Sequence, residues 1–247
     1  MRAMILAAGL GTRLRPLTDD RPKALVEIAG QTPLEITLRR LREFGIREVV
    51  VNVHHLADMV VEYLSRHANF GMRIEISRED ELLDTGGGLK KAAWFFLEDG
   101  SNNPFLLHNV DVLSTINFER MLQFHRDHNA LATLAVQKRK TSRYLLFDGE
   151  TALHGRSSSS KSPRRDTSAK QDLQALAFSG VHVISPRLFS MMTETGVFSI
   201  IDAYLRLAGQ GERILAFRAD DCYWRDLGKP ENLRQAEKDV QKKILQL

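Results

Sequence analysis

The fold is predicted by one stretch near the start of the chain, Leu6-Ala7-Ala8-Gly9-Leu10-Gly11-Thr12-Arg13-Leu14-Arg15-Pro16-Leu17-Thr18, followed closely by Arg21-Pro22-Lys23. Residues 3–8 form a short apolar run closed by Gly9, which is typical of a strand buried on both faces in a parallel sheet. The glycines allow the next turn to fold tightly and to approach a phosphate closely. Arg13 and Lys23 add positive charge beside that turn. The stretch therefore predicts a polyphosphate-binding loop after the first strand.

Two common phosphate motifs are excluded by the same residues. A P-loop requires Gly-x-x-x-x-Gly-Lys-Ser/Thr, which the chain lacks. A dinucleotide-binding fingerprint requires a third glycine where Leu14 stands. A plain strand-to-helix turn with two solvated basic residues would also contain Gly9-x-Gly11. The longer string, with Pro22-Lys23, is far more specific than the two glycines alone.

The first half of the chain alternates between strand and helix patterns. After the first strand we expect strands at 49–53, 73–77 and 105–107, and helices at 33–44, 57–67 and 88–97. This alternation predicts an α/β fold with a mostly parallel sheet and helices on both faces.

The second half reads differently. We expect strands at 132–136, 144–147, 151–154, 176–184, 213–217 and 223–227, short helices from Pro186 and from Phe198, and a closing helix at 230–245. A serine-rich basic segment at about 155–172 has almost no apolar residues, so it is predicted to be a mobile surface loop rather than a phosphate-binding lid. Residues 1–247 are expected to form one domain.

Composition limits the possible locations and partners. The 247 residues are 43% hydrophobic, enough to bury a full core, and the net charge of +4 comes partly from residues 161–170. A nucleic-acid partner is therefore not expected. The single cysteine, Cys222, rules out a disulfide within the chain and suits a reducing compartment. No apolar run approaches the ~20 residues that cross a bilayer, and the N-terminus does not read as a secretion signal. We expect a cytoplasmic protein without a membrane partner, as a monomer or small homo-oligomer.

With these residues in place, the chain resembles the sugar-1-phosphate nucleotidyltransferases, whose opening motif reads Gly-x-Gly-Thr-Arg-Leu-x-Pro-Leu-Thr and then Pro-Lys. The resemblance covers nearly the whole chain. It is strongest for the short bacterial N-acetylmuramate-1-phosphate uridylyltransferases, followed by mannose-1-phosphate guanylyltransferase-like proteins. Four later segments resemble the family's nucleoside, strand-end aspartate, sugar and Trp-x-Asp-x-Gly segments: Asp84-Thr85-Gly86-Gly87-Gly88, His108-Asn109-Val110-Asp111, Phe178-Ser179-Gly180-Val181 and Tyr223-Trp224-Arg225-Asp226-Leu227-Gly228.

The resemblance implies a single Rossmann-like domain of the nucleotide-diphospho-sugar transferase type. It also implies a central mixed sheet, a small β subregion over the sugar pocket, and a site at the carboxyl ends of the early strands. The implied reaction joins a nucleoside triphosphate to a sugar 1-phosphate, with Mg²⁺ as cofactor, and releases pyrophosphate. The implied site residues are Arg13 and Lys23 for catalysis; Leu6, Ala8, Gly9, Gly11, Thr12, Arg13, Thr85 and Gly86 for the nucleotide; Asn109, Ser179, Gly180 and Trp224 for the sugar; and Asp111 and Asp226 for the metal.

Elementary chemistry supports these roles. Both reactants are anionic, so catalysis needs cations and a rigid frame. Arg13 can hold β- and γ-phosphates with its planar fork, and Lys23 can act as a point charge near the α-phosphate. Asp111 and Asp226 offer the hard oxygen ligands that magnesium prefers. The plainer alternatives are that Asp111 caps a turn, that Asp226 pairs with its neighbour in sequence, and that Thr85 with its glycines opens a helix.

Departures from the family pattern leave the sugar unassigned. Val110 stands where glycine is usual, which is expected to narrow the site, and Lys229 stands where threonine is usual. The Glu-Lys pair of longer members is not recognisable, and Lys170 is only a weak substitute. Two other functions remain open. A phosphocholine-type cytidylyltransferase would need an aromatic cage, and a non-catalytic nucleotide-sugar sensor should have lost its charged site residues.

Overall fold

A computed structural model describes residues 1–158 and 173–245. Its centre is formed by β1 (Arg2–Leu6), which pairs in parallel with both β2 (Glu48–Val53) and β4 (Phe105–Asn109). The next strand outward, β3 (Arg73–Arg78), is parallel to β2. These four strands all carry their carboxyl ends to one edge of the sheet, as the alternation of strands and helices predicts.

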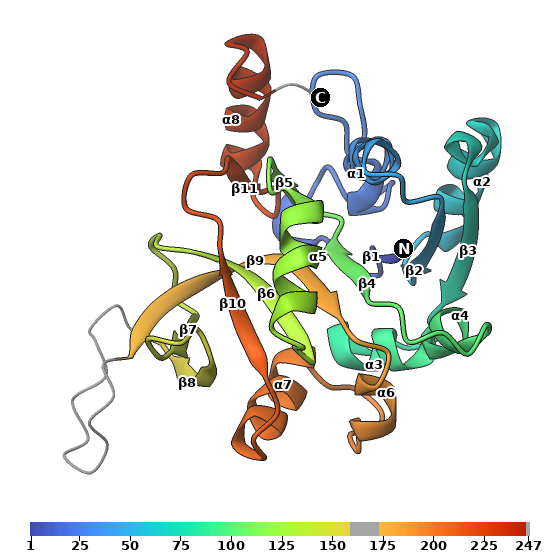
Figure 1. The fold of residues 1–247 in the computed structure, drawn as a ribbon. Helices are drawn as coiled ribbons and strands as arrows, with labels where there is room; N and C mark the ends of the chain where they lie inside the picture. The colour runs from blue at the N-terminus through green and yellow to red at the C-terminus, as the bar shows by residue number, and fades with distance from the viewer. Residues whose placement is uncertain (159–172, 246–247) are drawn as a thin grey trace.

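The remaining strands make the sheet mixed (Figure 1). The strand order is β10-β6-β9-β4-β1-β2-β3. The long β9 (Gln174–Ile184) is antiparallel to β4 and to β6 (Ala132–Gln137), and β10 (Ile214–Arg218) is parallel to β6. The hairpin of β7 (Tyr144–Phe147) and β8 (Leu153–Ser157) joins this sheet through β9. The predicted mixed, mostly parallel sheet is confirmed. A small β subregion over the sugar pocket stays a prediction.

Side chains of β1 alternate between two hydrophobic cores, one on each face of the sheet. Ala3 and Ile5 belong to the core covered by α1, α2 and α5, whereas Met4 and Leu6 belong to the core covered by α3, α4, α6 and α7. No helix in the described parts of the chain has the length and apolar content to span a membrane. The helices are α1 (Pro33–Glu43), α2 (Ala57–Arg66), α3 (Asp84–Lys91), α4 (Ala93–Leu97), α5 (Phe118–Asp127), α6 (Leu188–Met191), α7 (Ile200–Gly209) and α8 (Pro230–Gln241).

Several predicted boundaries were wrong. The helix expected at 88–97 begins at Asp84 and is interrupted at Ala92. The closing helix ends at Gln241 rather than at 245. The loop expected at 155–172 begins too early, because residues 155–157 pair with β7 as the end of β8. The rest of that segment, including Lys170, falls in 159–172, outside the described residues.

Two elements between β4 and β6 were not predicted. The first is β5 (Val112–Ser114), which pairs antiparallel with β11 (Trp224–Asp226) in a separate two-stranded sheet. The second is α5, which begins after Asn117, whose side chain accepts a hydrogen bond from the backbone of Arg120 at 2.9 Å. The β5–β11 pair matters for the site, because it brings the late part of the chain to the carboxyl end of β4.

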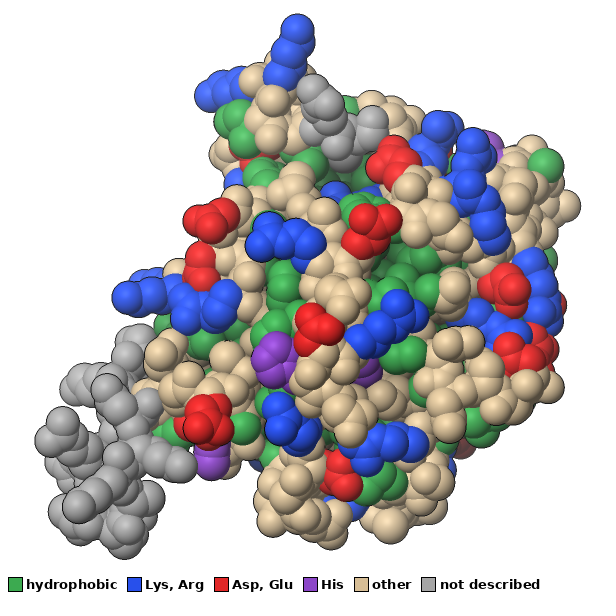
Figure 2. All heavy atoms as spheres, in the orientation of Figure 1, with side chains coloured by type: hydrophobic (Ala, Val, Ile, Leu, Met, Phe, Trp, Pro, Cys, Tyr) green, Lys and Arg blue, Asp and Glu red, His purple; other side chains and the backbone are tan. Residues whose placement is uncertain are grey.

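A third, smaller core fixes the loop after β1 against the end of the chain. Leu14 and Val26 from that loop pack with Leu227, Leu233 and Ala236, which lie on or just before α8. The loop is therefore anchored by apolar contacts even though most of its length is exposed. On the face shown in Figure 2, lysine and arginine side chains are interspersed with aspartate and glutamate.

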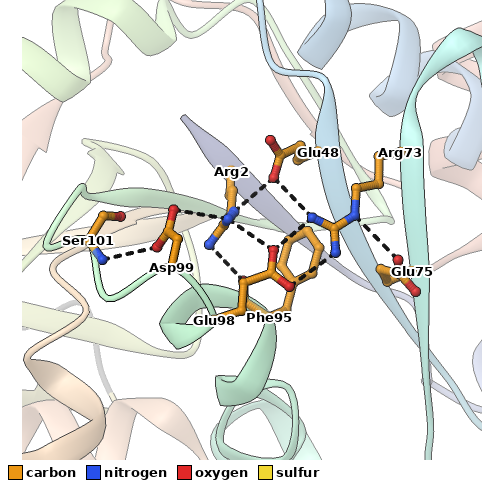
Figure 3. A network of polar contacts seen from close by, with 8 residues as sticks. All are labelled: Arg2, Glu48, Arg73, Glu75, Phe95, Glu98, Asp99 and Ser101. Carbon is orange, nitrogen blue, oxygen red and sulfur yellow. Dashed lines mark hydrogen bonds and ion pairs between the residues drawn. The ribbon is translucent and has the colours of Figure 1, made fainter.

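Ion pairs tie the opposite, amino-terminal edge of the sheet together (Figure 3). Arg2, Glu48 and Arg73 begin β1, β2 and β3, and Glu98 follows α4. Arg2 Nε lies 2.9 Å from Glu48 Oε2, and Arg73 Nη1 lies 2.7 Å from Glu98 Oε1. The hydrogen bond from Arg73 lowers the pKa of the Glu98 carboxyl. Exposed pairs like these contribute little individually, but this network joins α4 to the strands at the edge far from the cleft.

Candidate active site

A cleft of about 360 Å³ opens at the carboxyl edge of the parallel strands. Each of the four strands contributes to it: residues 6–9 at the end of β1, Asn52 near the end of β2, Glu79 just after β3, and residues 109–111 at the end of β4. The position agrees with the expected one. The full lining is Leu6, Ala7, Ala8, Gly9, Lys23, Asn52, Glu79, Leu82, Asp84, Thr85, Asn109, Val110, Asp111 and Val197.

The glycine-containing loop folds back on itself beside this cleft. Gly11 has φ +66°, and a Cβ there would lie 2.9 Å from Thr18 Cγ2. The Thr18 hydroxyl donates to the Gly11 carbonyl at 2.9 Å. Glycine is required because a side chain would meet both a strained backbone and a neighbour. Of the loop residues predicted to bind nucleotide, Leu6, Ala8 and Gly9 line the cleft, whereas Gly11, Thr12 and Arg13 lie beyond its lining.

Lys23 and Asp111 form an ion pair within the cleft. Lys23 begins a short 3-10 turn after Pro22, and Asp111 follows β4. Their side chains are 12% and 21% exposed. This pairing was not predicted from the sequence, because the two residues lie 88 positions apart. An acid and a base held together at the cleft wall can bind a polyanion and its counterion.

Asp226 lies next to Asp111 through the two-stranded sheet. Asp226 is opposite Val112 in the register, and the Leu227 nitrogen donates to the Asp111 carbonyl at 2.8 Å. Asp226 Oδ1 accepts a hydrogen bond from the Gly228 nitrogen at 2.7 Å. The alternative that Asp226 pairs with the adjacent Arg225 is therefore wrong.

That arginine, Arg225, donates instead to Asp239 on α8 at 2.8 Å. Asp226 therefore does not pair with Arg225, and the cationic group near it is the Arg13 guanidinium. A Cβ on Gly228 would lie 2.6 Å from Arg13 Nη2 and 2.7 Å from Asp226 Oδ1, so the Arg13 guanidinium and Asp226 border the same glycine. Glycine at 228 lets these two groups approach the backbone.

The two aspartates could hold a magnesium ion. Both are carboxylates, the hard oxygen ligands that the ion prefers, and they lie on adjacent segments. Residues 1–158 and 173–245 contain no group of three histidine, cysteine or acidic side chains placed to bind a metal. An ion here would therefore need phosphate or water oxygens to complete its shell, which is how magnesium is usually bound beside nucleotides.

A buried polar chain that was not predicted from the sequence braces the cleft floor. Asn52 Oδ1 accepts from the Ala7 nitrogen at 2.7 Å, and Asn52 Nδ2 donates to Glu79 Oε1 at 2.6 Å. Glu79 Oε2 accepts from the Leu83 nitrogen at 3.0 Å. A Cβ on Gly88 would lie 2.6 Å from Glu79 Oε1. The chain joins the ends of β1, β2 and β3 to the start of α3; a polar residue inside an apolar strand, Asn52, was the available sequence signal.

Thr85 and Gly86 have different surroundings. Thr85 lines the cleft, and its hydroxyl accepts from the Ile200 nitrogen at 3.0 Å. Gly86 is buried and absent from the lining; its nitrogen donates to the Phe198 carbonyl at 2.9 Å. A Cβ on Gly86 would come within 2.4 Å of the Phe198 ring. Close packing of α3 against α7 thus accounts for this glycine.

The predicted sugar-binding residues are connected to one another. Asn109 lines the cleft, and a Cβ on Gly180, whose φ is +76°, would lie 3.1 Å from Asn109 Nδ2. Trp224 donates from Nε1 to the Ser179 carbonyl at 2.8 Å. Ser179, Gly180 and Trp224 therefore form a connected group adjoining Asn109. Val110 is 4% exposed and packs in the core, so most of its side chain lies outside the cleft.

Comparison with known proteins bears on the whole chain. A family model described as nucleotidyl transferase matches residues 2–243. An N-acetylmuramate alpha-1-phosphate uridylyltransferase of Caulobacter vibrioides is 32% identical over 242 residues, covering 95% of both chains. A probable mannose-1-phosphate guanylyltransferase 1 of Oryza sativa subsp. japonica is 38% identical over 139 residues, which cover 56% of this chain and 38% of the rice protein. The match to the rice protein is thus confined to little more than a third of its length.

Solved structures of low sequence identity share the fold. A putative glucose-1-phosphate thymidylyltransferase from Bacillus anthracis, in complex with a sucrose, has a TM-score of 0.80 at 16% identity and covers 100% of this chain and 97% of its own. A UDP-glucose pyrophosphorylase complexed with UDP-glucose has a TM-score of 0.78 at 18% identity and covers 98% of each chain.

Proposed function

Because this chain belongs to the nucleotidyl transferase family, we propose that it is an enzyme that joins a nucleoside triphosphate to a sugar 1-phosphate and releases pyrophosphate. One observation carries the proposal. The Lys23–Asp111 ion pair lies in the cleft beside the glycine-containing loop, and the strand that ends at Asp226 pairs beside Asp111. Lys23 and Asp111 therefore lie in the cleft beside the glycine-containing loop, and Arg13 and Asp226 border Gly228 next to them.

The reaction needs no protein base. A phosphate oxygen of the sugar 1-phosphate attacks the α-phosphorus of the triphosphate, and a new P–O bond forms. The bond between that phosphorus and the oxygen leading to the β-phosphate breaks, and its electron pair leaves with pyrophosphate. The attacking phosphate is already ionised, so the protein must mainly position the reactants and offset their charge.

Lys23 and Arg13 are suited to offset charge at different places. Lys23 lines the cleft and is mostly buried, so its ammonium acts as a point charge near the α-phosphate and the entering phosphate. Arg13 is exposed beyond the lining and borders Gly228 and Asp226. Its planar fork suits the β- and γ-phosphates, which extend outward from the reacting centre.

Magnesium is the cofactor that we propose, with Asp111 and Asp226 as its protein ligands. When bound, the ion would supply positive charge against the phosphates as the new bond forms. The donor set supports this assignment, because two hard carboxylates next to a polyphosphate site match the preference of magnesium for few protein ligands. We also propose a cytoplasmic location, which the single cysteine supports.

The structure weighs against the cytidylyltransferase that would use phosphocholine. A quaternary ammonium needs an aromatic cage, and no aromatic residue of the described chain is among those lining the cleft. Trp224, which is near it, already has the Arg139 guanidinium 3.5 Å from its ring centroid. The sensor alternative is disfavoured because Arg13, Lys23, Asp111 and Asp226 are all retained.

The test is release of pyrophosphate over a grid of substrates with magnesium present. UTP, GTP, dTTP and CTP would each be combined with mannose 1-phosphate, glucose 1-phosphate, N-acetylmuramate 1-phosphate and phosphocholine. We expect turnover with at least one sugar 1-phosphate and none with phosphocholine. The proposal would be refuted if phosphocholine were the only acceptor that supports pyrophosphate release, or if none of the acceptors in the grid supported it.

A further inference from the structure

Buried polar atoms without partners gather around Trp224. In the described parts of the chain, four of the seven buried side-chain nitrogen and oxygen atoms without a hydrogen-bond partner belong to residues beside or near this ring. These four atoms are Asn109 Oδ1, Ser114 Oγ, Arg139 Nε and Ser179 Oγ. Since buried polar groups in folded proteins are nearly always paired, such a concentration indicates a place that a polar ligand fills.

Three contacts connect these residues to Trp224. Ser114 is directly opposite Trp224 in the β5–β11 register, and Trp224 Nε1 donates to the Ser179 carbonyl. The Arg139 guanidinium carbon lies 3.5 Å from the centroid of the Trp224 ring. Asn109 joins the group through Gly180, the residue after Ser179, and it also lines the cleft. Of these residues, Asn109 lines the cleft, whereas Ser114, Arg139 and Ser179 are connected to Trp224.

Two contacts fix the long side chain of Arg139 in place. The residue follows β6, stacks on Trp224 and donates from Nη2 to the Phe178 carbonyl. Burial lowers the pKa of the Arg139 guanidinium, and the charge of Asp226 acts in the opposite direction. A guanidinium fixed by stacking and by one backbone bond loses little further freedom when it binds an acceptor. Its Nε–H is the donor that still has no acceptor.

We infer that Arg139 binds the sugar moiety of the sugar 1-phosphate, donating from Nε to a sugar oxygen in a subsite shared with Asn109 and Ser179. The inference rests on the proposed transferase function. A sugar hydroxyl both donates and accepts, so the hydroxyls of one sugar can pair with both the Arg139 donor and the Asn109 acceptor. Ionised phosphate offers acceptors only and would leave Asn109 Oδ1 unpaired.

The side chains on the proposed nucleotide side of the cleft are not available to bind the sugar. There the side chains of Asn52, Glu79 and Thr85 are all bonded to other parts of the protein. A purely structural clamp on Trp224 would account for the stacking and for the bond to Phe178. It would not account for the unpaired Nε–H or for the neighbouring unpaired oxygens.

The test compares Arg139→Met, which keeps length and apolar bulk but removes every donor, with Arg143→Met as the matched control. Arg143 is exposed, and its side chain has no hydrogen bond or ion pair with the described residues. Pyrophosphate release is measured with mannose 1-phosphate or N-acetylmuramate 1-phosphate, whichever the parent uses better. We expect Arg139→Met to raise KM for the sugar 1-phosphate about 10- to 100-fold. KM for the triphosphate should stay within about 2-fold, and the control should match the parent.

An unchanged KM for the sugar 1-phosphate, or an equal rise for both substrates, would overturn the inference while leaving the transferase function intact. A parent without turnover on any substrate pair would overturn both. A second readout uses fluorescence, because the chain has two tryptophans and Trp94 is 47% exposed on α4. In a Trp94→Phe background, emission reports on Trp224 alone. The sugar 1-phosphate should change that emission in the Trp94→Phe protein at a concentration about 10-fold or more below the one needed when Arg139→Met is added. Equal concentrations for the two proteins would count against the inference.

Discussion

Replacing Glu79 by glutamine tests whether the buried polar chain under the cleft is a brace for the nucleotide side. The change keeps the shape of the side chain but turns one acceptor oxygen into a donor. Glu79 is 4% exposed and accepts from both Asn52 Nδ2 and the Leu83 nitrogen. Glutamine can accept from only one of them. Rotating the Asn52 amide to compensate would break its bond to the Ala7 nitrogen.

The expected cost follows from that geometry. One buried donor must be left facing another donor, which costs about 1–3 kcal/mol. For a chain of this size, that corresponds to a drop in Tm of about 3–10 °C. Because residues 6–9 line the cleft and Ala7 is one end of the chain of bonds, KM for the triphosphate should also rise, about 3- to 10-fold. Urea unfolding, thermal melting and steady-state kinetics would measure these effects.

Glu81→Gln is the matched control for Glu79→Gln. Glu81 is exposed, and its side chain makes no hydrogen bond or ion pair within the described part of the chain. The control should melt with the parent and keep its KM. If Glu79→Gln lost less than about 0.5 kcal/mol, the bonds would be dispensable and the reasoning from donor and acceptor counts would be refuted. If Glu79→Gln lost stability but kept the parent's KM for the triphosphate, the hydrogen bonds among Asn52, Glu79 and Leu83 would have a structural role only.

The remaining predictions concern charge at the site and acid stability. Lys23→Ala and Arg13→Ala should each lower turnover at saturating substrate by at least about 100-fold, because each removes charge stabilisation of the transition state; near-normal rates for both would refute the phosphate-binding roles. Asp111→Asn and Asp226→Asn should fold normally, lose most activity and need more magnesium for half of the remaining rate, and an unchanged magnesium requirement would remove them as ligands. Burial lowers the pKa of three histidines to about 4, about 4 and about 3: His108, His125 and His182. Their contribution to stability is complete above the unfolded-state pKa of about 6.5 and falls as the pH drops toward 4, by about 2 kcal/mol for each histidine at pH 5. Urea unfolding at pH 7.5 and pH 5 measures the loss, and a total below about 1 kcal/mol would contradict the burial argument.

The sequence predicted the fold well where a continuous apolar run or a helical spacing of apolar residues marks an element. The β1 run is apolar on both faces because both faces are covered, and its alternate residues enter two different cores. The start of α3 was missed for a physical reason. Three consecutive glycines disfavour a helix by propensity, yet here they lie inside α3, where Phe198, Gly196 and Glu79 leave no room for side chains. Tertiary packing overrode local preference.

For the site, motif residues could be placed but their partners could not. The pairing of Lys23 with Asp111 depends on β4 lying beside β1, and the place of Asp226 depends on β5, a three-residue strand too short to show a periodic pattern. Arg139 carried no motif at all. Its setting arises from a stack on Trp224, a residue 85 positions later in the chain, and a contact between such distant residues leaves no trace in local sequence.

The two sides of the cleft differ in how their polar groups are used, and this difference bears on specificity. On the side that we propose binds the nucleotide, the side chains of Asn52, Glu79 and Thr85 are already bonded within the protein. Recognition there must fall largely to the backbone of residues 6–9, which changes little with side-chain identity. On the side that we propose binds the sugar, the unpaired atoms of Asn109, Ser114, Arg139 and Ser179 are side-chain atoms. A site with unmatched buried side-chain donors and acceptors rejects ligands that cannot pair with them far more strongly than an apolar pocket does. Discrimination among substrates should therefore reside mainly in the sugar subsite, and substitutions around Trp224 should change the preferred sugar before they change the preferred nucleotide.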